Sequence, residues 1–294
     1  MRLSHFAPHF AAALLLSSGG AFQLAGAASI ASNASNASIA SAATPLVIGE
    51  SFSIASRALN ETRHINVYMA RAWDTAPTAP LPVLYMPDGG VAEDFLHVAG
   101  LLQVSVANGT MRPFMLVGIE NTQRRRDLTG PTENADDRKI AAVVGGAPAY
   151  RAFLRDELMP EVRRRYRTTG ETAIVGESLG GLFVVETYLL EPQLFDHYLA
   201  FDPSLWWNHG ALPRQAAALM ARGKPGKHSL YLASSSEAGI ASEVQRLAQV
   251  LETQAPPGLH WHLEKLPDEN HGTIYHPAAL KAFRAVFKPQ VPAG

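Results

Sequence analysis

The segment Gly176-Glu177-Ser178-Leu179-Gly180 constrains the fold of this 294-residue chain more than any other stretch. A short segment rich in β-branched residues, 172–175, precedes it and predicts a buried strand. Residues 181–190 follow, contain no proline, and are long enough to form a helix. A strand, Gly-x-Ser-x-Gly and a helix in this order are typical of a tight turn that holds the serine in a strained backbone conformation. The Ser178 hydroxyl is therefore expected to project from the end of a central strand.

Such a turn can also support chemistry at Ser178. Gly176 and Gly180 leave room for the strand and the helix to approach each other closely. The start of the helix presents backbone N–H groups, including that of Leu179, to a developing negative charge. This arrangement is the nucleophile elbow of an α/β-hydrolase, and we interpret Ser178 as a candidate nucleophile.

Strand-like and helix-like stretches alternate from about residue 45 onward. This pattern predicts a single α/β domain with a mostly parallel central sheet flanked by helices. A leading antiparallel pair is expected at residues 51–59 and 64–70. Later strands are expected at residues 82–86, 113–119, 172–175, 197–201, 228–233 and 261–265. Helices are expected at residues 91–107, 150–166, 181–190, 212–221, 242–253 and 277–287, and a long loop at 120–146.

The N-terminal residues are predicted to lie outside this domain. Residues 10–16 form a short apolar run, and Ala25-Gly26-Ala27 matches a small-x-small cleavage site, so residues 1–27 are predicted to be a signal peptide. The apolar run is too short to span a bilayer as a helix. Residues 28–44 repeat Ser, Ala, Asn and Ile and are predicted to be a flexible linker. We expect a secreted or periplasmic protein with its catalytic domain at residues 45–294.

Composition excludes several classes of function. The net charge of -1 gives no electrostatic case for binding nucleic acid or a membrane surface. The chain has no cysteine, which excludes disulfides, thiolate catalysis and zinc-cysteine sites. We expect neither a metal nor an organic cofactor.

The general base and the acid are sought after the later strands, because an α/β-hydrolase triad follows the chain order nucleophile, acid, histidine. His271 lies in a loop between the last expected strand and the last expected helix, and it is the predicted base, with His276 as the alternative. Glu237 follows the strand at 228–233 and is the predicted acid, although it would equally suit a helix start. Asp202 is the second candidate, and a Ser-His dyad without a strong acid remains open.

An oxyanion hole requires two backbone N–H groups. One is expected from Leu179, and the second from Gly89 or Gly90, which follow the strand at 82–86. The alternative interpretation of the two glycines is a simple tight turn.

The chain resembles the esterase D-type and siderophore-esterase branch of the α/β-hydrolases. Besides the elbow, the resemblance is carried by residues 64–68 (HINVY), 83–89 (VLYMPDG), 117–122 (VGIENT), 124–129 (RRRDLT), 202–207 (DPSLWW) and 270–272 (NHG). It implies hydrolysis of a small carboxylic ester, with Ser178 as nucleophile and His271 as base. This branch usually has a histidine at the position of Glu177.

Four further residues are candidates for binding the substrate. Arg124 and Arg126 lie in the long loop, and Trp206 and Trp207 follow a strand end. Together they would suit an anionic aromatic ester through ion pairing and stacking. Otherwise the arginines are solvated and the tryptophans fill the core. An acyltransferase, a peptidase and a non-catalytic binding protein on the same fold stay as alternatives to the esterase.

Overall fold

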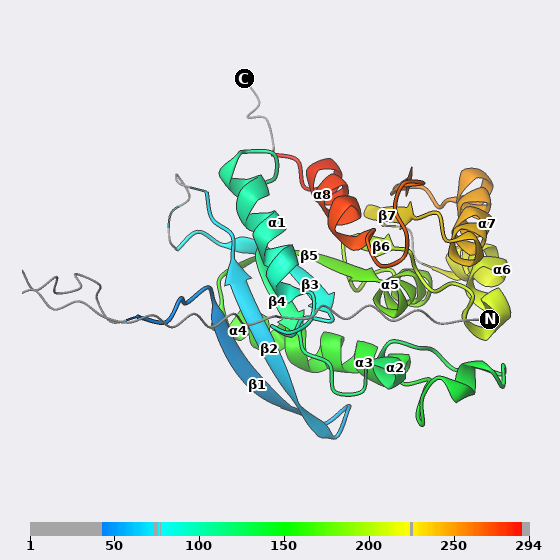
Figure 1. Cartoon of the computed structure of the whole chain (residues 1–294), viewed down its shortest axis with the longest axis horizontal. Helices are drawn as coiled ribbons and strands as arrows, with labels where there is room; N and C mark the ends of the chain where they lie inside the picture. The colour runs from blue at the N-terminus through cyan, green and yellow to red at the C-terminus, as the bar shows by residue number, and fades with distance from the viewer. Residues whose placement is uncertain (1–42, 73–75, 77, 224–225, 290–294) are drawn as a thin grey trace, which may run out of the picture. The chain divides into compact units, whose positions relative to one another are not determined.

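The structure is a computed structural model that describes residues 43–72, 76, 78–223 and 226–289 (Figure 1). The chain divides into two units, Met1–Leu46 and Val47–Gly294, and the helices and strands found in the described residues belong to the second. The predicted signal peptide and all but the last two residues of the predicted linker lie outside the described residues. In the part of the chain that is described, no helix combines the length and the apolar character needed to cross a bilayer.

The second unit is built on one eight-stranded sheet with the strand order β1-β2-β4-β3-β5-β6-β7-β8. The strands are β1 Glu50–Ser56, β2 Glu61–Met69, β3 Leu81–Pro87, β4 Met115–Ile119, β5 Thr168–Glu177, β6 His197–Phe201, β7 His228–Ser234 and β8 Leu259–Lys265. β1 and β2 pair antiparallel, β2 pairs antiparallel with β4, and the remaining neighbours pair parallel. The predicted mostly parallel sheet with a leading antiparallel pair is confirmed.

The helices cover both faces of this sheet (Figure 1). They are α1 Phe95–Ala107, α2 Arg124–Asp127, α3 Ala147–Phe153, α4 Met159–Arg165, α5 Leu179–Leu190, α6 Trp207–Arg222, α7 Ala238–Gln254 and α8 Tyr275–Val286. Two short segments complete them, a 3₁₀ turn η1 at Asp137–Lys139 and a π-helical turn η2 at Leu154–Leu158.

Three expected segments differ from the structure. The helix expected at 150–166 is divided into α3, the π-helical turn η2 and α4, and Pro160, in the first turn of α4, has no backbone N–H to continue a regular helical ladder. The loop expected at 120–146 contains α2 and η1. Helix α6 starts at Trp207, and Asn208, His209 and Gly210 kink it with left-handed backbone angles.

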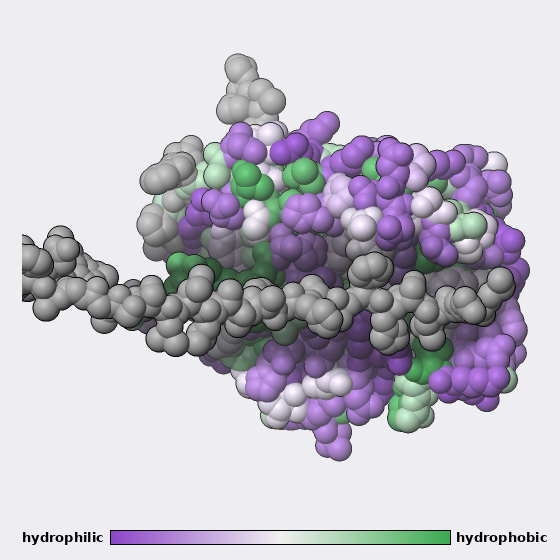
Figure 2. All heavy atoms as spheres, viewed as in Figure 1, coloured by the Kyte–Doolittle hydropathy of each residue, from purple (hydrophilic) through white to green (hydrophobic). Residues whose placement is uncertain are grey.

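The core lies on both sides of the sheet because side chains of a buried strand alternate between its faces. In β3, Val83 and Tyr85 pack into the cluster that includes α3, α4, α5, α6 and α7, whereas Leu84 and Met86 pack with α1 and α8. The outer surface seen in Figure 2 is mainly hydrophilic, with small hydrophobic areas. The molecule is therefore a three-layer α/β structure in which the parallel strands are covered on both faces.

A buried ion-pair network ties the antiparallel strand β2 to the loop that carries α2. The Arg63 side chain is fully buried, and its Nη1 donates to Glu61 Oε1 at 2.6 Å and to Asp127 Oδ2 at 2.7 Å. Arg126 reaches the same two carboxylates, with Nη2 2.8 Å from Glu61 Oε1 and Nε 2.7 Å from Asp127 Oδ1. Burial opposes ionisation of Glu61, but hydrogen bonds from Arg126, Thr122 and Arg63 lower its pKa to about 2.

Replacing Asp127 with Ala should destabilise the fold, because the Arg63 cation would stay buried with one carboxylate partner fewer. Breaking a buried ion pair on one side costs about 3 kcal/mol, which urea unfolding followed by circular dichroism would measure. Asp136→Ala is the matched control, since Asp136 pairs with Lys139 at an exposed site and its loss should leave the midpoint unchanged. Equal midpoints for the two variants would contradict a stabilising role of the network.

Candidate active site

The turn between β5 and α5 holds Ser178 in a backbone conformation that residues other than glycine rarely adopt. Ser178 has φ 59° and ψ -119° and directly precedes the first residue of α5. A Cβ atom on Gly176 would lie 2.5 Å from the carbonyl carbon of Gly180, so only glycine fits there. The Ser178 N–H donates to the Phe201 carbonyl at the end of β6 at 3.0 Å. The local sequence therefore forms the predicted elbow, and backbone contacts hold its serine at the carboxyl end of the parallel strands.

The structure brings Ser178, His271 and Asp202 together from three separate loops. Ser178 Oγ lies 3.0 Å from Nε2 of His271, whose loop connects β8 with α8. On the other side of the imidazole ring, Nδ1 lies 3.1 Å from Oδ2 of Asp202, which directly follows β6. With Nδ1 donating to the carboxylate, Nε2 is free to accept the Ser178 hydroxyl hydrogen. This is the hydrogen-bond order of a Ser-His-Asp triad.

Asp202 is fixed and ionised by its surroundings. Its side chain is fully buried, and it accepts hydrogen bonds from the Ser235 N–H at 2.7 Å and the Ser235 hydroxyl at 2.6 Å. Burial alone would raise the pKa of Asp202, but hydrogen bonds from His271 and Ser235 outweigh it and lower that pKa. The hydrogen bond with Asp202 in turn raises the pKa of His271. Ser235 was not singled out from the sequence, which marks it only as one of three serines after a strand.

The structure corrects the expected partner of His271 from Glu237 to Asp202. Glu237 is exposed and directly precedes the first residue of α7, where its backbone carbonyl accepts from the N–H groups of Ile240 and Ala241. The chain leaves β7 through Ser235, so this serine, and not Glu237, faces the triad. His276, the alternative base, lies against His97 of α1, with their ring centroids 5.6 Å apart.

The two glycines considered for the oxyanion hole differ in what binds their N–H groups. The Gly89 N–H donates to the Ile119 carbonyl at 3.0 Å, which extends the sheet ladder. The Gly90 N–H donates to Oε2 of the Glu93 side chain at 2.7 Å. A rotation of the Glu93 side chain would release the Gly90 N–H. Release of the Gly89 N–H would instead require the ends of β3 and β4 to separate. Leu179 begins α5, so its N–H has no carbonyl one turn earlier in that helix.

The four predicted substrate-binding residues do not form one group. Arg124 binds Asp88 with two hydrogen bonds, from Nε at 2.5 Å and from Nη2 at 2.9 Å. Arg126 belongs to the buried network of β2 and α2 described above. Trp207 is buried and donates from Nε1 to the Gly130 carbonyl at 2.9 Å. Trp206 is partly exposed, at 38%.

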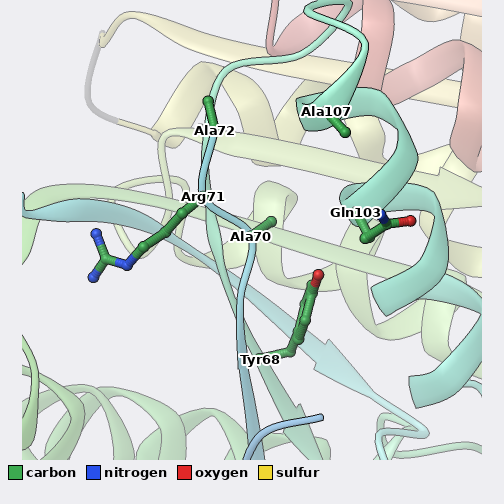
Figure 3. Close-up of a pocket in the computed structure, with 6 residues that line it drawn as sticks. All are labelled: Tyr68, Ala70, Arg71, Ala72, Gln103 and Ala107. Atoms are coloured by element: carbon green, nitrogen blue, oxygen red, sulfur yellow. The ribbon is translucent and has the colours of Figure 1, made fainter. Parts of the chain in front are cut away.

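Two pockets lie near the sheet ends. One, of about 460 Å³, is lined by Gln123, the three arginines 124–126 and residues 141–143. The other, of about 390 Å³, is lined by Tyr68, Ala70, Arg71, Ala72, Gln103 and Ala107 (Figure 3). It lies beside the end of β2, where Met69 pairs with Met115 at the start of β4. Ser178 follows the carboxyl end of a parallel strand, whereas this second pocket lies beside the amino-terminal end of β4. The pocket and the triad are therefore at opposite ends of the parallel strands.

Comparison with known proteins gives consistent matches. A family model described as "Putative esterase" matches residues 56–261. The ferri-bacillibactin esterase BesA of Bacillus subtilis is 32% identical over 164 residues, which cover 51% of this chain and 56% of that protein. The siderophore triacetylfusarinine C esterase of Aspergillus fumigatus is 31% identical over 195 residues, covering 60% and 62%. The matched region thus spans less than two thirds of the length of each of these two relatives.

A solved structure extends the likeness. The IroE-like serine hydrolase from Shewanella oneidensis superimposes with a TM-score of 0.73 at 27% identity, over 81% of this chain and 80% of that one. The similarity therefore includes most of the three-layer unit.

The two carboxylates proposed from the sequence can be distinguished by their effect on His271. Asp202→Asn should lower the pKa of the His271 imidazole, because the hydrogen bond to the Asp202 carboxylate, which is the largest contribution to the raised pKa of His271, is lost. Glu237→Gln should change it little, since Glu237 is exposed and acts only at a distance. An NMR titration of the ring protons measures both values, and a larger shift for Glu237→Gln would contradict the geometry.

Proposed function

This chain belongs to the "Putative esterase" family, and we propose that it is a serine esterase that hydrolyses carboxylic esters through an acyl-enzyme intermediate. The observation that carries the proposal is the continuous hydrogen-bonded line from Ser178 Oγ through His271 to the buried carboxylate of Asp202. A hydroxyl so placed can lose its proton to the imidazole as it attacks a carbonyl carbon.

The proposed reaction has two halves. In the first, Ser178 Oγ bonds to the ester carbonyl carbon while Nε2 of His271 takes the hydroxyl proton. The tetrahedral intermediate then expels the alcohol, which receives that proton from His271. In the second half, His271 takes a proton from water as the water oxygen attacks the acyl carbon. Collapse of this intermediate releases the carboxylic acid and returns the proton to Ser178. Asp202 stays ionised and stabilises the imidazolium in both halves.

Leu179 and Gly90 are the proposed donors to the oxyanion. The Leu179 N–H adjoins the nucleophile at the start of α5, where the helix dipole also favours negative charge. The Gly90 N–H is bound to the Glu93 carboxylate in this structure, so the substrate oxyanion would replace one negatively charged oxygen by another. Gly89 is not a proposed donor, because its N–H is bound within the sheet.

Siderophore-type esters are the proposed substrates, on the support of relatives whose names include ferri-bacillibactin esterase and triacetylfusarinine C esterase. Of the four binding candidates, Arg124 and Trp206 have partly exposed side chains, at 35% and 38%. We propose that these two contact an aromatic or anionic part of the ester, whereas Arg126 and Trp207 support the fold.

Replacing Ser178 with Ala should lower kcat by about 10³-fold or more, because the acyl-enzyme can no longer form. Hydrolysis of p-nitrophenyl esters and of a ferric triscatecholate lactone would measure the loss and show which class the wild type prefers. The melting temperature should stay close to that of the wild type.

Ser204→Ala provides a matched control, because Ser204 Oγ lies 3.4 Å from Ser178 Oγ. A fluorophosphonate should still label Ser178 in this variant and should not label Ser178→Ala. Full activity of a folded Ser178→Ala protein would refute the proposed mechanism.

We also propose that the protein is exported from the cytoplasm. The support is the apolar run at residues 10–16 followed by the small-residue site at 25–27. N-terminal sequencing of protein from fractions of the native host should find a mature start at Ala28 or close to it. Protein that starts at Met1 in the cytoplasmic fraction would contradict this proposal.

A further inference from the structure

The His271 imidazole faces two carboxylates. Its Nδ1 lies 3.1 Å from Asp202 Oδ2 and 3.3 Å from Glu177 Oε1. The single Nδ1–H makes its hydrogen bond with Asp202, and among the described residues Glu177 Oε1 has no hydrogen-bond partner although it is buried. A buried carboxylate oxygen without a donor opposes folding, so its presence beside the triad points to a role in function.

Two positively charged groups act on Glu177, and of these His271 is the one that is not bound twice to another carboxylate. Arg124, from α2, acts on Glu177 electrostatically, but its guanidinium is bound twice to Asp88, which follows β3. Asp88 and Asp202 repel the Glu177 charge, and the phenol of Tyr275 on α8 also interacts with it electrostatically. Ionised Glu177 is thus stabilised chiefly when the neighbouring imidazole carries a positive charge.

We propose that Glu177 is a positioning residue for His271. The Glu177 carboxylate stabilises the imidazolium that forms when His271 Nε2 takes the Ser178 proton. This inference rests on the proposed function. It assigns a role to the elbow residue directly before the nucleophile, beside the role of Asp202. Glu177 acts through His271 and bonds to no reacting atom.

The two carboxylates respond differently to pH. Hydrogen bonds keep Asp202 ionised, as described above, whereas burial raises the pKa of Glu177 to about 7, with Asp88 and Asp202 adding to the shift. Above that pH Glu177 is ionised and supports the imidazolium, and below it Glu177 is protonated and the support is lost. Ionised Glu177 also raises the pKa of His271, so removing the charge should move the acid limb of activity to lower pH.

Glu177→Gln tests the proposal because it keeps the shape of the side chain and removes its charge. At pH 8 kcat/KM should fall about tenfold, and at pH 6 it should change by less than about twofold, since the wild-type residue is already protonated there. The acid limb of the kcat/KM profile should shift down by about half a pH unit or more. A uniform loss across the pH range would show a structural role only, and an unchanged profile would show no role, so either result overturns the proposal.

Two further variants serve as matched controls. Glu177→Asp keeps a carboxylate at the elbow and should restore the pH dependence at least in part, which also covers the case that Glu177→Gln fails to fold. Glu237→Gln removes an exposed charge that affects His271 only at a distance, so its profile should superimpose on that of the wild type. A Glu237→Gln profile that shifts as far as that of Glu177→Gln would overturn the specific assignment.

The NMR titration of His271 separates this proposal from the proposed function. The pKa of His271 should be lower in Glu177→Gln than in the wild type, whether or not the protein hydrolyses any ester. An inactive wild type that shows this shift would refute the esterase and retain the contact. An active wild type without the shift would refute the role of Glu177 alone.

Discussion

The lack of space at the end of β5 is the constraint on which the site depends. The backbone of Gly176 lies so close to that of Gly180 that no Cβ atom would fit between them, and in this tight turn Ser178 takes a positive φ. The same residue is tied to the end of β6, since its N–H bonds to Phe201 and its carbonyl accepts from the Ser204 N–H at 3.0 Å. Asp202 lies between these two anchors. Although they come from different loops, nucleophile and acid are therefore held by one set of backbone contacts, and His271 reaches them from the loop between β8 and α8.

Local sequence patterns predicted much of the fold and two of the three residues of the hydrogen-bonded triad, Ser178 and His271. Strand, turn and helix around Ser178 lie within one short segment, and His271 lies in the short loop after the last strand. The acid was harder to predict, because Asp202 and Glu237 follow neighbouring strands and the sequence does not show which loop turns toward His271. In the structure the hydroxyl of Ser235 donates a hydrogen bond to Asp202 and helps to hold its carboxylate beside His271. The irregular helix η2 was missed, although Pro160 could have indicated a break.

The arginine motif shows a second limit of reading sequence alone. Adjacent cations at positions 124–126 suggested one subsite for an anion, yet Arg124 and Arg126 each bind a carboxylate from a residue that is distant in the chain. Glu61 on β2 binds Arg126, and Asp88 after β3 binds Arg124. Charge can be read from a sequence, but the counter-ion that neutralises it depends on the order of strands in the sheet. Trp206 and Trp207 are likewise adjacent in sequence and differ in exposure.

The bond between Glu93 and Gly90 has a consequence for any ligand that imitates the reaction. In the proposed mechanism the Glu93 carboxylate occupies the Gly90 N–H, one of the two oxyanion donors, before substrate binds. It therefore competes with any anionic ligand for that donor. Glu93 also accepts from the Asn121 side-chain amide at 2.9 Å, so its release disturbs the loop after β4. The free energy of binding a tetrahedral anion is then the difference between the state in which the anion occupies the Gly90 N–H and the state in which Glu93 does. The apparent affinity is lowered because the anion can bind only to molecules in which Glu93 has released the Gly90 N–H.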